Sequence, residues 1–356
     1  MINVTKTFLP PLEEYQSYLK GIWERVWVTN NGQLVTELES KLKEYLSIEN
    51  LWFTTNGTIP IQMALKALEI KGEVVTTPFS YVATTNAILW ENCQPVFVDI
   101  NPDDFCINAD LIEAKITNKT EAILATHVYG FPCEVVKIEN IAKRHNLKVI
   151  YDAAHAFGVE LNGQSLLNFG DISTCSFHAT KVFHSVEGGA IVIKDKVLAE
   201  KIYWQRQFGH KGDIYKYLGI NAKNSEMHAA MGLCMLPKVT EIIRKRKELS
   251  QHYNQLLNWE QLYKPQTNQN IKYNFAYYPV VFQSETQMLK VVAQLNHQNI
   301  FPRRYFYPSL NTLSFSLGQS CPISEDISSR VLSLPLFYDL APESIDQISS
   351  IINNNL

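Results

Sequence analysis

The sequence predicts an α/β protein with two domains. A large, doubly wound domain with a mostly parallel sheet is expected over residues 1–240, and a smaller α+β domain over residues 241–356. From about residue 70 to residue 235, short β-rich runs alternate with helical patterns, which is typical of a parallel sheet. Several of these runs are apolar throughout, as expected for strands covered on both faces. A chain of 356 residues is also long enough for two cores.

The expected elements follow one another in a regular order. We expect strands at residues 72–78, 94–100, 121–130, 147–154, 171–179 and 188–195. Helices are expected at residues 84–92, 108–116, 133–146 and 197–208, with Asn108 and Asn146 as boundary residues. A long amphipathic helix over residues 235–257 leads into the smaller domain. There we expect a strand at 274–282, a helix at 285–299 and a last helical pattern at 346–355.

Composition excludes several classes of protein. The formal net charge is -3, so the chain has no general basic field that would attract nucleic acid. The run Arg244–Lys247 lies in a helical pattern and indicates a solvated helix face rather than a binding patch. No apolar run of about 18 residues is present, so we expect no membrane span. The first residues lack the apolar core of a signal peptide, and we expect a cytoplasmic protein.

Two sequence patterns that would indicate other chemistry are missing. The six cysteines are scattered, with no CxxC pair and no histidine at ligand spacing. We therefore expect buried, reduced thiols and no metal site. No G-x-G-x-x-G run is present, which disfavours a dinucleotide cofactor.

One lysine lies in an unusual place for a surface charge. Lys181, in SFHATKVFHSVEGG, follows an apolar run and precedes Gly188 and Gly189, which permit close backbone approach. Most lysines are solvated. Here we expect a partly desolvated amine with a lowered pKa, able to act as nucleophile and base.

Other candidate residues follow expected strands, where ligands collect in open α/β sheets. Gly57 and Thr58 open a helical pattern and either bind a phosphate at the helix N-terminus or only cap the helix. Asp152 ends a buried strand and needs a partner, either backbone amides or a protonated heteroaromatic nitrogen. His155 either packs beside the same ligand or is a hydrogen-bonded core histidine. Tyr81 either stacks on a flat ligand or packs in the core.

Taken together, these features match one cofactor. Lys181 offers a Schiff-base amine, Asp152 an acid for a pyridinium nitrogen, and Tyr81 a stacking ring. Gly57, Thr58 and Ser176 offer donors to a phosphate. The set is what pyridoxal 5'-phosphate requires.

The chain also resembles a known family along nearly its whole length. It is similar to the DegT/DnrJ/StrS-type nucleotide-sugar aminotransferases, which are fold-type I pyridoxal phosphate enzymes with a seven-stranded-type sheet. The resemblance rests on an ordered series of motifs: WVTNNG, TNGT, GEVVTTPFSYVATTNAI, PVFVDI, THVYG, VIYDAAHAFG, SFHATK, EGGAIV, GINAKNSEMHAA and LSLPLF.

The resemblance implies roles for particular residues. Lys181, Asp152 and His155 match the catalytic lysine, the pyridinium partner and the residue packed against the ring. Tyr81, Gly57, Thr58 and Ser176 match cofactor contacts. Asn221 matches an asparagine that reaches the phosphate in the neighbouring subunit's site, which implies a homodimer with shared active sites. Candidate substrate contacts are Asn30, His184, Arg304, Tyr305 and Tyr307, although the stretch around Arg304 fits a hinge equally well.

Two positions depart from the family pattern. Ile59 and Pro60 follow the phosphate turn, and Pro60 suits the first turn of a helix. Lys223 replaces an arginine and cannot make a bidentate pair, which puts a substrate contact there in doubt.

The resemblance further implies a reaction. L-Glutamate would donate its amino group, leaving 2-oxoglutarate, and the acceptor would be dTDP-4-keto-6-deoxy-D-glucose for surface polysaccharide such as O-antigen. The alternatives are a sugar 3-aminotransferase, a sugar dehydratase and a non-catalytic regulatory protein. The family's dehydratases carry histidine at the lysine position, so Lys181 disfavours that branch.

Overall fold

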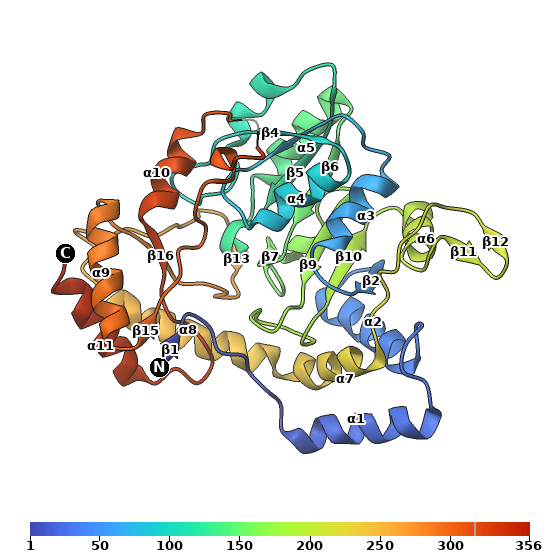
Figure 1. The fold of residues 1–356 in the computed structure, drawn as a ribbon, viewed down its shortest axis with the longest axis horizontal. Helices are drawn as coiled ribbons and strands as arrows, with labels where there is room; N and C mark the ends of the chain where they lie inside the picture. Colours follow the sequence, from blue (N-terminus) through green and yellow to red (C-terminus); the bar gives the residue numbers. More distant parts are fainter. Residues whose placement is uncertain (317) are drawn as a thin grey trace.

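The computed structural model describes residues 1–316 and 318–356 (Figure 1). Its centre is a seven-stranded sheet with the strand order β2–β10–β9–β6–β5–β3–β4. The strands are β2 (Leu51–Thr54), β3 (Glu73–Thr76), β4 (Gln94–Phe97), β5 (Thr120–Thr126), β6 (Lys148–Asp152), β9 (Ile172–Ser176) and β10 (Gly189–Ile193). β10 is antiparallel to β2 and β9, and the other neighbouring strands are parallel. The predicted fold class is confirmed.

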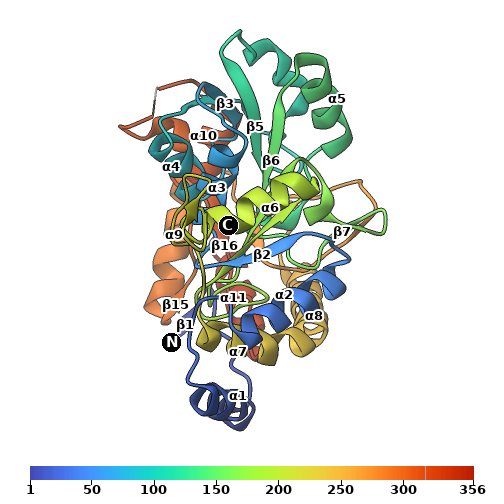
Figure 2. The same cartoon turned by 90° about the vertical axis from the view of Figure 1, so that its right-hand side faces the viewer.

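Helices cover both faces of this sheet because its side chains alternate between two cores. Val74 and Leu124 pack with α3 (Ile59–Ala67), α4 (Val82–Trp90) and α6 (Lys196–Gln205). Val75 and Ile123 pack with α2 (Gln33–Leu46), α5 (Val135–His145) and α7 (Glu226–Met235). Figure 2 shows α4 and α5 on opposite sides of β5 and β6. Burial on both faces explains the uniformly apolar strand sequences.

The C-terminal part has a core of its own. It contains α8 (Val239–Leu256), α9 (Glu285–His297), α10 (Pro322–Arg330) and α11 (Pro342–Asn353), with β14 (Pro279–Val281) antiparallel to β16 (Val331–Ser333). At the N-terminus, β1 (Ile2–Asn3) pairs in parallel with β15 (Ile300–Phe301). Both termini therefore lie at one end of the molecule (Figure 1). The division at residue 240 stays a prediction, and α8 begins beside it.

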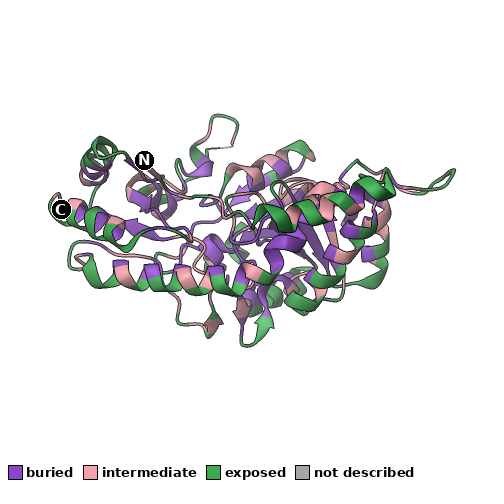
Figure 3. Cartoon of the chain, turned by 90° about the horizontal axis from the view of Figure 1, so that it is seen from below, coloured by how far each residue is buried: buried purple, intermediate pink, exposed green. Residues whose placement is uncertain are grey.

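Smaller elements complete the fold. α1 (Leu12–Arg25) lies at the periphery, and β7 (Glu160–Leu161), β8 (Gln164–Ser165) and β13 (Ile271–Lys272) form a three-stranded sheet. β11 (His210–Lys211) and β12 (Ile214–Tyr215) form a projecting hairpin. Figure 3 shows buried residues gathered at the centre, with exposed residues over the outer faces of the helices and over this hairpin. Within the described residues, six 3₁₀ turns connect the elements: Ala109–Leu111, Glu113–Lys115, Val128–Gly130, Leu166–Asn168, Leu236–Lys238 and Leu310–Thr312.

Some expected elements differ from the structure. Residues 108–116 form two 3₁₀ turns rather than an α-helix, because the Asn108 side chain accepts the Asp110 amide and starts a tight turn. The expected strand at 274–282 is restricted to β14. β2 lies where the sequence implied a strand before the turn of Gly57 but gave no bounds for it. Asn146 does end α5, in the left-handed conformation.

Candidate active site

Most of the predicted site residues meet in a cavity of about 290 Å³ at the carboxyl edge of the sheet. Its lining includes the full predicted cofactor set of one subunit: Gly57, Thr58, Tyr81, Asp152, His155, Ser176 and Lys181. Asp152 ends β6 and Ser176 ends β9, while the turn containing Gly57 follows β2. The topology therefore brings together residues that are far apart in the sequence.

Lys181 lies in the loop 177–188, between β9 and β10. Ser176 pairs with Gly189, so both ends of this loop stay at the cavity. The Lys181 Nζ donates a hydrogen bond to the Tyr277 hydroxyl at 3.1 Å. Burial lowers the pKa of the Lys181 amine, but Tyr277 and Asp152 outweigh burial and raise the pKa above its ordinary value. The expectation of a lowered pKa, which rested on desolvation alone, is wrong.

The Asp152 carboxylate is buried and anchored on both oxygens. Its Oδ2 accepts a hydrogen bond from the Thr84 hydroxyl at 2.6 Å, and its Oδ1 accepts one from the Ala154 amide at 3.1 Å. The Thr84 hydroxyl is itself 2.9 Å from the Ser80 hydroxyl. Thr84 was missed from the sequence, where its one signal is a position one helical turn after Tyr81.

His155 presents a neutral ring beside the cavity. The Tyr129 amide donates to His155 Nδ1 at 3.2 Å, so the neutral ring carries its proton on Nε2. Burial, and after it the charge of Lys181, lowers the pKa of His155 well below its ordinary value. The ring stacks on Phe306 with centroids 5.4 Å apart. A flat, uncharged surface results.

The turn before α3 fits closely against the end of β9. A Cβ added at Gly57 would lie 2.7 Å from Ser176 Cβ, so only glycine fits there. The Asn56 side-chain oxygen accepts the amides of Thr58 and Ile59, each at 2.9 Å. These two amides are therefore already occupied by Asn56, whereas the sequence had suggested that they are free to bind a phosphate. The Thr58 side chain makes no capping bond, which leaves its hydroxyl for a ligand.

Two aromatic residues complete the lining at the open side. Tyr81, the N-cap residue of α4, is 60% exposed, so its ring remains accessible to a flat ligand. Tyr305 also lines the cavity and is the only predicted substrate contact that does so among the described residues.

The remaining predicted substrate contacts do not line this cavity, and two of them make other contacts. His184 is buried, with its Nε2 2.7 Å from the Phe8 carbonyl oxygen and its Nδ1 accepting the Val186 amide. The Arg304 guanidinium pairs with Glu285 at 2.6 Å and lies over the Tyr307 ring, 3.4 Å from its centroid. Both ring nitrogens of His184 are therefore used within the fold, and neither Arg304 nor Tyr307 lines the cavity.

Two predicted asparagines are exposed and do not line this subunit's cavity. Asn30 adopts a left-handed conformation in the turn before α2. Asn221 accepts a hydrogen bond from Lys223 Nζ at 2.9 Å. The family resemblance assigns Asn221 to a neighbouring subunit, and its exposed position is compatible with that expectation.

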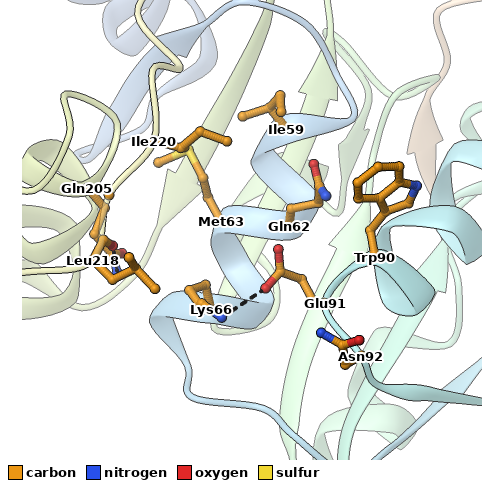
Figure 4. Close-up of a pocket in the computed structure, with 11 residues that line it drawn as sticks. Ile59, Gln62, Met63, Lys66, Trp90, Glu91, Asn92, Gln205, Leu218 and Ile220 are labelled. Carbon is orange, nitrogen blue, oxygen red and sulfur yellow. Dashed lines mark hydrogen bonds and ion pairs between the residues drawn. The ribbon is translucent and has the colours of Figure 1, made fainter.

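A second hollow, of about 310 Å³, lies between α3, the end of α4 and residues 218–220 (Figure 4). Its charged residues Lys66 and Glu91 pair with each other at 3.3 Å. Trp90 and Leu218 on its rim are exposed. Ion pairing within the hollow makes it a poor candidate for catalysis.

Neither a membrane-crossing helix nor a metal-binding cluster occurs among residues 1–316 and 318–356. No helix in this part of the chain is long and apolar enough to cross a membrane. No group of three or more His, Cys, Asp or Glu side chains in it is arranged to hold a metal ion.

The fold and this cavity define a class of enzyme. The chain belongs to the DegT/DnrJ/EryC1/StrS aminotransferase family, whose model matches residues 12–353. Aminotransferases of this family depend on pyridoxal 5'-phosphate.

The chain is similar over nearly its whole length to particular members of this family. A dTDP-4-amino-4,6-dideoxy-D-glucose transaminase of Shigella dysenteriae is 42% identical, over 99% of this chain and 98% of that protein. The enzyme of the same name from Escherichia coli is 38% identical over the same shares. Among solved structures, DesI in the presence of its TDP-sugar product is 29% identical over 99% of this chain and 92% of that one, with a TM-score of 0.93.

The residues of the cavity fit the family's cofactor. The Gly57–Ser176 contact leaves no room for a side chain where a phosphate turn must approach β9. Asp152 lines the same cavity as this turn and presents a buried carboxylate of the kind that pairs with a pyridinium nitrogen. Lys181 brings an amine to the same space. Gly57, Thr58 and Ser176 would hold the phosphate, with the rings of Tyr81 and His155 against the cofactor.

Proposed function

We propose that the protein transfers an amino group from L-glutamate to dTDP-4-keto-6-deoxy-D-glucose and so produces dTDP-4-amino-4,6-dideoxy-D-glucose. The observation that carries this proposal is the convergence of Lys181, Asp152 and the Gly57 turn on one cavity. The sugar is suggested by the relatives that are 42% and 38% identical and carry that activity in their names. A product of this kind serves surface polysaccharide synthesis.

The chemistry is divided between cofactor and protein. When bound, pyridoxal 5'-phosphate supplies a conjugated ring that accepts the electron pair left when an amino acid loses its α proton. Lys181 Nζ removes that proton. When the keto sugar is aminated, Lys181 Nζ delivers a proton to the sugar carbon that receives the amino group. Asp152 stabilises positive charge on the ring nitrogen, and the Thr84 hydroxyl keeps the carboxylate in place.

His155 contributes without changing its charge. A protonated imidazole beside a positively charged ring would repel it, whereas burial keeps His155 neutral through its lowered pKa. Its ring and that of Tyr81 line the cavity and would pack against the cofactor, which would exclude water from it.

The proposal includes a homodimer with shared sites. Large exposed apolar side chains occur on α1 and the following turn, and on residues 208–220, including Trp23, Val26, Phe208, Leu218 and Ile220. The hollow of Figure 4 lies on the same stretch of surface as residues 218–220. Patches of this kind mark protein interfaces. The exposed Asn221 directly follows residues 208–220, and from there it would reach the partner's phosphate.

Two experiments test the proposal. Borohydride reduction followed by peptide mapping is expected to give a pyridoxyl adduct on Lys181, and its absence would overturn the enzymatic assignment. Synthetic 3-keto and 4-keto dTDP-6-deoxy sugars should then be supplied separately with L-glutamate. NMR of the amino product is expected to show amination at C4, and amination at C3 would identify a 3-aminotransferase.

A further inference from the structure

Tyr277 reaches the active-site amine from the C-terminal part of the chain. It lies between β13 and β14, and its hydroxyl accepts a hydrogen bond from Lys181 Nζ at 3.1 Å. It is the one side-chain hydrogen-bond partner of that amine among residues 1–316 and 318–356. In the sequence, Tyr277 falls within the expected strand at 274–282, with no sign of a contact to the active site.

The backbone before Tyr277 is clamped by a buried arginine. Arg246 of α8 donates from Nε to the Phe275 carbonyl at 2.8 Å and from a terminal nitrogen to the Ala276 carbonyl at 2.6 Å. It belongs to the basic run that the sequence suggested was solvated, yet it is 5% exposed. Burial lowers the pKa of Arg246 to about 10, so the guanidinium keeps its charge at neutral pH. A buried cation held by two carbonyl groups is a costly arrangement and fixes those carbonyls firmly.

A second side chain ties the same segment to the cofactor side of the cavity. Asn274 Nδ2 donates to the carbonyls of His155 and Phe157, at 2.8 and 3.0 Å. Its Oδ1 accepts the Ala276 amide at 3.1 Å. The loop that follows Asp152 and the segment that leads to Tyr277 are therefore held as one unit.

The Tyr277 ring is fixed as well as its backbone. It meets the His155 ring edge to face with centroids 4.9 Å apart, and the Tyr129 ring lies 5.5 Å away. Packing on two sides restricts the direction in which the hydroxyl points. A side chain needed only to fill space would not require a hydroxyl at this position, since phenylalanine has the same ring.

We propose that Tyr277 is a positioning residue for Lys181, and that Arg246 and Asn274 hold it in place for this task. Its hydroxyl accepts an N–H of the free Lys181 amine during the part of the reaction in which that amine has no covalent bond. No bond is made or broken at Tyr277; the oxygen only fixes Nζ beside the substrate and favours its protonated form. The inference rests on the proposed role of Lys181.

The test replaces Tyr277 by phenylalanine in the full-length protein. The first measurement is competitive acetylation of Lys181 in the cofactor-free protein as a function of pH, read by peptide mapping. We expect the Tyr277→Phe variant to reach half-maximal reactivity at a lower pH than the wild type. Tyr273→Phe is the matched control, because its hydroxyl donates to the Tyr129 carbonyl at 3.0 Å and does not touch Lys181.

The second measurement follows the reaction of the cofactor-loaded enzyme with L-glutamate. We expect kcat of Tyr277→Phe to fall about 10- to 100-fold, as for a lost hydrogen bond to a charged group. KM should change little, and the α-deuterium isotope effect should increase. Arg246→Lys, which keeps the charge but loses the two-pronged contact, should shift Lys181 reactivity in the same direction. Its effect should largely disappear when Tyr277 is already phenylalanine.

The two proposals fail in different ways. An unchanged acetylation profile in Tyr277→Phe, or an equal shift in Tyr273→Phe, would overturn the role of Tyr277. A missing pyridoxyl adduct on Lys181 in the wild type would overturn the proposed function, while the acetylation experiment would still report on the Tyr277–Lys181 contact.

Discussion

Gly57 and Ser176 approach so closely that a methyl group on Gly57 would lie 2.7 Å from Ser176 Cβ. Gly57→Ala is therefore expected to push the phosphate turn away from β9 and to weaken cofactor binding at least about tenfold, or about 1.4 kcal/mol. Equilibrium dialysis with pyridoxal 5'-phosphate measures this. Gly163→Ala is the control for backbone strain: its φ is +79°, so alanine is unfavourable there, but no atom lies within 4 Å of the added Cβ and Gly163 does not line the cavity. Equal affinity in the two variants would contradict the prediction.

Thr84 is expected to matter for turnover through Asp152. Thr84→Val keeps the shape of the side chain but removes the hydroxyl that donates to Asp152 Oδ2 at 2.6 Å. Loss of such a bond is worth about 1.5–3 kcal/mol, so kcat should fall about 10- to 100-fold. Thr84→Ser should retain most of the activity. Steady-state kinetics measure kcat of both variants. A wild-type kcat in Thr84→Val would show that the hydrogen bond from Thr84 to Asp152 is not needed for turnover.

Val186 stores backbone strain in the loop that carries Lys181. Its φ is +68°, a left-handed conformation that is unfavourable for a β-branched residue. Glycine relieves a strain of about 1–3 kcal/mol and costs part of that in unfolded-state entropy. Val186→Gly should therefore raise the free energy of unfolding by about 1 kcal/mol in urea titrations. Val136→Gly, on the exposed face of α5, should lower it by a similar amount.

Asp104 is expected to make stability depend on pH. Burial raises the pKa of Asp104 to about 7. Above about pH 4 the unfolded chain releases this proton, while the folded protein keeps it until pH 7, so this group lowers stability as pH rises through that window. The slope is at most about 1.4 kcal/mol per pH unit. Asp104→Asn should remove it in urea titrations from pH 4 to 8, whereas a substitution at the exposed Asp103 should not.

Much of the large domain was predictable because its strands are buried on both faces. The apolar runs before Asp152 and Ser176 identified strand ends, and strand ends in a parallel sheet share one edge. The bounds of β2, Leu51–Thr54, were not predicted because this strand precedes the regular alternation of strand and helical patterns, which begins near residue 70. The contacts of His184 with the backbone of Phe8 and Val186, and of Arg304 with Glu285, could not be inferred from residue type.

The burial of Arg246 could have been predicted from the helical spacing of its apolar neighbours, but the adjacent basic residues suggested a solvated face. Its neighbours in RKRK suggested a solvated face, yet Ile242, Leu249 and Tyr253 share its side of α8 and are buried. Helical spacing, rather than local charge, determined its environment. Tyr277 had no comparable signal, because its contact with Lys181 depends on how the C-terminal part packs against the sheet.

The pairing of β1 with β15 has a consequence for how the chain folds. Residues 2–3 find their partners only at residues 300–301, so this contact closes a loop of nearly the whole chain. During synthesis the first segment must remain unpaired until residues 300–301, in the last sixth of the chain, have been made. We expect the strand that begins the sequence to be among the last to form.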